Sequence, residues 1–261
     1  MSGPIDVHAL DPVIALQRRF AGLHPALERC HPLAVALDAE FHIYDLNETG
    51  EHYCYMQSNP LPMPIPEGVR AAFPLNEYGG RIACVVTPEV FDELDGYVTI
   101  LHEFIHCYQY TTSEAALRRG LTVARQAEAA GDMLWELQYD FPYMDPAFAT
   151  LFARFMTAVG TGDLAQADGL QQGLKAALSA PDYEYLVWQE WKEGFARFIE
   201  NRLQEALGNQ QNLGGSEMPF NRVSFYPAGA AYIDLIERES PGAIRNLSHL
   251  FQRLFQPGDL E

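Results

Sequence analysis

The chain has 261 residues, 48% of them hydrophobic, and its 35 acidic against 17 basic side chains give a formal net charge of −18. This length and apolar content are enough for one large domain with a buried core. The negative charge argues against nucleic acid and anionic membranes as partners, because both select basic protein surfaces.

Targeting signals are not evident in the sequence. Acidic residues interrupt the apolar positions of the first twenty residues, so we expect no signal peptide, and no apolar run approaches transmembrane length. The four cysteines, Cys30, Cys54, Cys84 and Cys107, have no paired spacing, which favours free thiols in a reducing cytoplasm. We therefore expect a cytoplasmic protein, and the sequence gives no indication of its oligomeric state.

Short strand-like segments separated by turn residues predict a small sheet in the first part of the chain. Residues 11–30 are expected to form one or two helices. Strands are predicted at 33–37, 41–46, 52–56 and 81–86. Four prolines in residues 58–66 exclude a regular helix there and favour an extended crossing.

The second part of the chain has helical periodicity almost throughout. Helices are predicted at 113–139, 145–159, 163–179, 183–206, 228–238 and 241–255. No domain boundary is apparent. The expected fold class is therefore α+β, a single domain over 1–261 with a helix-and-sheet part (1–95) and a helical part (96–261).

Between these parts lies the most informative segment, His102-Glu103-Phe104-Ile105-His106. In a helix, two histidines four positions apart rise from the same face and can bind one zinc ion, while the glutamate between them can act on a metal-activated water. The surrounding pattern supports a helix whose apolar side is buried and whose chemical side faces a cleft. The apolar side comprises Tyr97, Ile100, Leu101, Phe104, Ile105 and Tyr108.

A catalytic zinc site needs a third protein ligand. Metzincins would supply it from a histidine six residues after the second one, with a glycine between, but Gln109 and Thr112 occupy those positions. A distant carboxylate is the remaining option. Residues 188–200 hold three, Glu190, Glu193 and Glu200, on the polar side of a predicted helix, and periodicity does not choose between Glu190 and Glu193.

The segment Lys192-Glu193-Gly194-Phe195-Ala196 resembles the Asn-Glu-Gly-Phe-Ala helix of gluzincin peptidases, best known from puromycin-sensitive-type aminopeptidases. The resemblance covers two short helices, about 95–110 and 184–206. It implies that His102, His106 and Glu193 bind zinc and that Glu103 is the general base. Gly194 would allow backbone to pack closely beside the ligand.

The sequence also departs from those aminopeptidases. The interval between His106 and Glu193 is much longer, Lys192 replaces their asparagine, and no Gly-x-Met-x-Asn segment occurs. The chain is therefore expected to be a compact, single-domain relative, and exopeptidase specificity is not carried over.

Further roles are implied by the same resemblance. A tyrosine hydroxyl often supports the oxyanion in gluzincins, and Tyr226 is the candidate, with Tyr232 in reserve. An edge strand there pairs with the substrate backbone, a role that would fall to Ile82-Ala83-Cys84. Independently of the resemblance, ligating histidines usually donate their other N–H to a carboxylate or carbonyl. Asp132 and Glu136, in an otherwise apolar stretch, are the candidates, with Glu136 preferred because Leu134, Trp135 and Leu137 surround it.

These observations predict a zinc-dependent hydrolase, most simply a metallopeptidase. Its substrate would be a peptide or a small amide. Two alternatives stay open: hydrolysis of a non-peptide amide or ester at the same site, and a non-catalytic interaction protein that keeps the zincin scaffold.

Overall fold

A computed structural model describes residues 4–258. The packing of the backbone divides the chain into two compact units, one formed by residues up to Thr112 together with Ala206–Gly208, and the other by Ser113–Glu205 with Asn209 onward. The fold is α+β, as predicted. The expectation that both units form a single domain stays a prediction.

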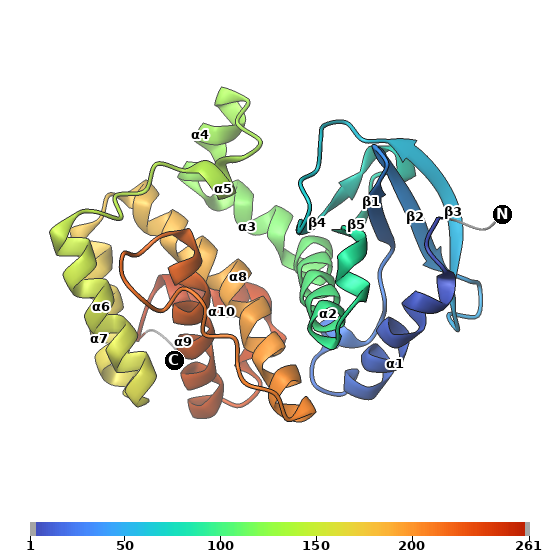
Figure 1. Ribbon diagram of the computed structural model, residues 1–261. Coiled ribbons are helices and arrows are strands. Elements are labelled where there is room, and N and C mark those ends of the chain that lie inside the picture. The colour runs from blue at the N-terminus through green and yellow to red at the C-terminus, as the bar shows by residue number, and fades with distance from the viewer. Residues whose placement is uncertain (1–3, 259–261) are drawn as a thin grey trace. The chain divides into compact units, whose positions relative to one another are not determined.

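The first unit contains a five-stranded mixed sheet with the order β3-β2-β1-β5-β4 (Figure 1). All neighbouring strands are antiparallel except β1 and β5, which run parallel with Leu33 opposite Cys84. The strands are β1 (Leu33–Leu37), β2 (Glu40–Leu46), β3 (Tyr53–Pro60), β4 (Arg70–Leu75) and β5 (Arg81–Val86).

Alternation along the strands gives this sheet two apolar faces. On one face Phe41, Ile43, Ala83 and Val85 pack together in a buried cluster. The opposite side chains of β5 are buried as well, and α2 packs against β4 and β5. The sheet therefore supports the helix that carries the histidine motif.

The helices of the first unit are short apart from α2. They are η1 (Val7–Leu10), α1 (Asp11–Phe20), η2 (Pro25–Leu27), η3 (Asn76–Tyr78), η4 (Pro88–Phe91) and α2 (Leu94–Gln109). A π-helical turn, η5 (Tyr110–Glu114), continues α2.

The second unit consists, over its described residues, of helices and loops (Figure 1). Its helices are α3 (Ala115–Gly120), α4 (Thr122–Ala130), α5 (Trp135–Gln138), α6 (Pro146–Thr161), α7 (Leu164–Ala177), α8 (Ala180–Leu207), η6 (Arg222–Ser224), α9 (Phe225–Glu239), η7 (Ala243–Arg245) and α10 (Leu247–Phe255). Nineteen residues of the long helix α8 are buried, so it is the central element of this unit.

Three predictions about elements are wrong. The single helix predicted over 113–139 is four helical pieces, because Leu121 is extended and Gly131 ends α4 in a left-handed conformation. The last helix begins at Leu247 instead of 241, since Gly242 has φ 95° and Asn246 caps the helix.

The third error concerns the edge of the sheet. Strand β4 was not predicted, because Pro74 and the prolines before it indicate irregular structure. Proline is tolerated in strands mainly at the edge of a sheet, and β4 is an edge strand. The segment Ile82-Ala83-Cys84 is therefore not at an edge, since β5 pairs with β1 on one side and β4 on the other.

In the described part of the chain, no helix combines the length and the apolar composition that crossing a bilayer requires. The four cysteines are free thiols, as predicted.

Helices α8 and α9 meet at two glycines. A Cβ atom on Gly194 would lie 2.7 Å from the Cα of Gly229, and one on Gly229 would lie 2.7 Å from the Cα of Glu190 and closer still to its carbonyl oxygen. Real Cβ atoms do not approach backbone this closely, so both positions need glycine. Gly194 therefore provides close backbone packing beside Glu193.

We expect Gly194→Ala to lower the free energy of unfolding by about 3 kcal/mol, at the upper end of the usual overpacking cost, because the clash is with rigid backbone. Gly169→Ala in α7 is the matched control: nothing lies near its added methyl group, so it should be neutral or stabilising by up to about 1 kcal/mol. Urea unfolding of both variants measures the difference. Equal stabilities would contradict the close crossing.

Candidate metal centre

The two histidines of the motif lie one turn apart on α2, and their side chains are 7% and 6% exposed. The Nε2 atoms of His102 and His106 are 3.2 Å apart. Two ligands of one tetrahedral zinc, each about 2.05 Å from the metal, are about 3.3 Å apart. The imidazole pair thus already has the separation that a shared zinc ion requires.

His106 has a hydrogen-bond partner one turn further along α2. The side-chain oxygen of Gln109 lies 2.8 Å from His106 Nδ1, where it accepts a hydrogen bond when that nitrogen is protonated. In this tautomer Nε2 of His106 carries the lone pair through which a neutral histidine binds a metal.

Gln109 is fully buried, and sequence reasoning had given this orienting role to Glu136. The signal that points to Gln109 is its i,i+3 spacing from His106 on one helical face.

Glu103, between the histidines, is 5% exposed. Its charge acts on two thiols, Cys84 of β5 and Cys107 of α2: burial raises the pKa of both, and the Glu103 carboxylate raises it further. Both thiols are therefore protonated packing groups.

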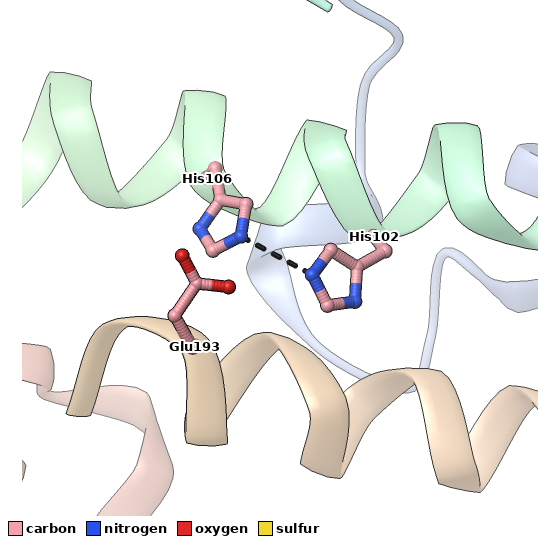
Figure 2. Close-up of side chains that lie close together, drawn as sticks. All are labelled: His102, His106 and Glu193. Atoms are coloured by element: carbon pink, nitrogen blue, oxygen red, sulfur yellow. Dashed lines mark hydrogen bonds between the residues drawn. The ribbon is translucent and has the colours of Figure 1, made fainter. Parts of the chain in front are cut away.

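Three potential ligands lie together: one ligand atom from each of His102, His106 and Glu193 falls within 4.8 Å of the others. Figure 2 shows the Glu193 carboxylate turned toward the two imidazole rings. Two imidazoles and one carboxylate are a donor set that catalytic zinc takes in proteins. The residues therefore fit a zinc ion by chemical type and, for the histidine pair, by distance.

Glu193 is also tied to Tyr226, the residue proposed to support an oxyanion. Burial raises the pKa of Tyr226, and the nearby charge of Glu193 raises it further. Arg222 donates to the Tyr226 hydroxyl. The phenol thus stays protonated and remains a hydrogen-bond donor.

Tyr232, the reserve candidate, has other partners. Its hydroxyl is hydrogen-bonded to Asp168, and Arg253 donates to the hydroxyl at 3.1 Å and to the Asp168 carboxylate at 2.7 and 2.8 Å. The side chain is fully buried. This arrangement joins α9, α7 and α10 and occupies the hydroxyl.

Lys192, which precedes the candidate ligand, is held in an ion-pair network of the second unit. Its Nζ atom lies 2.7 Å from Glu136 and 3.2 Å from Glu114. Burial lowers the pKa of Lys192, but these two carboxylates raise it more, so the net shift is upward and the ammonium stays charged. Glu136 therefore anchors the lysine.

Glu190, the alternative third ligand, is not a member of the cluster. It is fully buried, and its Oε2 atom accepts from Gln171 Nε2 at 2.7 Å. Burial raises the pKa of Glu190 from 4.5 to about 8. The side chain is thus a neutral acid at physiological pH, whereas a metal ligand must be ionised.

This buried acid predicts a pH dependence of stability. Between pH 4.5 and 8 the folded chain keeps a proton on Glu190 that the unfolded chain releases, so stability falls as pH rises through this window. We expect Glu190→Gln to be more stable than wild type by about 3 kcal/mol at pH 7 and by little at pH 4.5. Urea unfolding of both proteins at both pH values measures this difference in stability. A difference between Glu190→Gln and wild type that does not vary with pH would contradict the prediction.

No protein-family model, no curated protein and no solved structure matches this chain.

Proposed function

We propose that the protein is a zinc-dependent hydrolase that cleaves peptide bonds. The proposal is carried by the grouping of His102, His106 and Glu193 within 4.8 Å. It is supported by Gln109, which lies within hydrogen-bond distance of His106 Nδ1, and by Glu103, which lies between the two histidines in the same turn.

A zinc ion held by these three residues would lower the pKa of a water molecule to about 7 and polarise the substrate carbonyl. The carboxylate of Glu103 accepts a proton from the attacking water and passes it to the leaving amine. The Tyr226 hydroxyl donates a hydrogen bond to the developing oxyanion, a role that contributes about 3–4 kcal/mol in other enzymes.

The edge strand β4 supports a peptide substrate in particular. Its outer side has no partner strand among the described residues, and α2 packs against it. An extended peptide could add to such an edge through backbone hydrogen bonds. The substrate-pairing role implied by resemblance thus moves from β5 to β4.

Two measurements test the proposal together. After zinc loading and desalting, elemental analysis should find one zinc per chain, and anomalous scattering at the zinc edge should identify the three ligands. The loaded protein should cleave members of a mixed peptide library, lose the activity with a chelator and regain it with zinc. Absence of stoichiometric zinc would overturn the proposal. Zinc binding without cleavage of peptides or small amides would instead favour a non-catalytic interaction protein with a zincin scaffold.

A further inference from the structure

An arginine without a carboxylate partner lies beside the candidate site. Arg222 is half-buried, and its guanidinium donates to the Tyr226 hydroxyl. Within residues 4–258 it forms no ion pair with any carboxylate. The other arginines that are not exposed all do, at 2.7 to 3.5 Å: Arg70, Arg118, Arg197 and Arg253.

The lack of a partner is unusual because the chain carries 35 acidic side chains against 17 basic ones. Burial lowers the pKa of Arg222, but Tyr226, Glu193 and Tyr185 raise it more, so the charge is retained. The nearby anion is the candidate metal ligand Glu193. Once that carboxylate binds a cation, the charge of Arg222 is no longer balanced locally.

The rest of the surroundings suits a single negative charge. Besides Tyr226 and Glu193, two further phenols, Tyr143 and Tyr185, lie close enough to Arg222 to interact with its charge. Burial raises the pKa of Tyr143 to about 12, so it stays a neutral donor. A second guanidinium, that of Arg197, lies 5.7 Å from the centroid of the Tyr226 ring, but it is paired with Glu200 and the carbonyl of Asn212. The guanidinium of Arg222, which has no ion pair within residues 4–258, matches the charge and the planar geometry of one carboxylate.

The position of Arg222 is fixed by its backbone. Asn221 caps η6: its side chain accepts from the Val223 N–H at 2.9 Å, and Ser224 Oγ accepts from the Asn221 N–H at 3.1 Å. This reciprocal cap holds Arg222 in η6, which directly precedes α9 and places the arginine one helical turn before Tyr226. A guanidinium held in this way is preorganised to bind a ligand.

We propose that Arg222 binds the free carboxylate of the substrate, so that the enzyme acts on short peptides near their C-terminal end. This inference rests on the proposed function, and it specifies the class of substrate that the proposed peptidase cleaves. The neighbouring Tyr226 contacts the reacting carbonyl in that proposal, which places the carboxylate on the residue after the scissile bond.

The kinetic test compares N-benzoylglycyl-phenylalanine with its C-terminal amide on the zinc-loaded protein. We expect kcat/KM for the free acid to exceed that for the amide by about 10- to 100-fold, mainly through KM. The ratio should fall close to one in Arg222→Gln and recover partly in Arg222→Lys. The exposed Arg154→Gln is the control and should keep the wild-type ratio.

A binding test does not depend on turnover. Calorimetry should detect hippurate binding to zinc-loaded wild type at least about 10-fold more tightly than to zinc-loaded Arg222→Gln, with hippuramide unaffected. Equal hippurate affinities, or equal cleavage of acid and amide by wild type, would overturn the role of Arg222 while leaving a zinc hydrolase intact. If neither substrate is cleaved, the result counts against peptidase activity. In that case the difference in hippurate affinity between wild type and Arg222→Gln still tests whether Arg222 binds a carboxylate.

Discussion

Replacement of Glu103 by glutamine is expected to lower kcat/KM for peptide hydrolysis by roughly 10²–10⁴-fold, the usual contribution of a general base. Glutamine has nearly the same shape, but its amide cannot accept the proton of the attacking water. Glu103 is not among the three potential ligands, so the variant should bind zinc as wild type does. Steady-state kinetics and zinc content, measured on the same preparation, check both parts.

The control for this experiment is Glu128→Gln, which removes an exposed carboxylate from α4. It should keep full activity. If Glu103→Gln and wild type hydrolyse peptides at the same rate, the mechanism is wrong, whatever the zinc content.

Replacement of Glu193 by alanine is expected to weaken zinc binding by more than about 100-fold. Loss of a residue that only supports a ligand through a hydrogen bond typically weakens metal binding by about 10- to 100-fold, and this substitution removes a ligand itself. Competition with a chromophoric chelator measures the affinity. Hydrolysis should fall with metal occupancy and return in part at high zinc concentration.

Glu205→Ala is the matched control, since Glu205 is an exposed glutamate of the same helix, α8. It should bind zinc like wild type. Wild-type zinc affinity in Glu193→Ala would remove the third ligand from the proposed site and favour a different one.

Local rules account for what could be predicted. The helical repeat of 3.6 residues places His102 and His106 on one face whatever surrounds them. The short apolar runs at 33–37 and 81–86 identify two buried strands with their observed ends. Strand β4 escaped prediction because Pro74 is disfavoured in most strands, and only its position at the edge makes it compatible with the sheet.

The sequence by itself determined the histidine pair, the glutamate between them and the two glutamates that could complete the set. Only the tertiary structure distinguished Glu190, buried against Gln171, from Glu193, which lies with the histidines. It also brought Gln109 to His106 and, within residues 4–258, left Arg222 next to Tyr226 without an ion pair. The physical reason is that periodicity fixes which side chains share a face, whereas the burial and the partners of that face depend on residues distant in the chain.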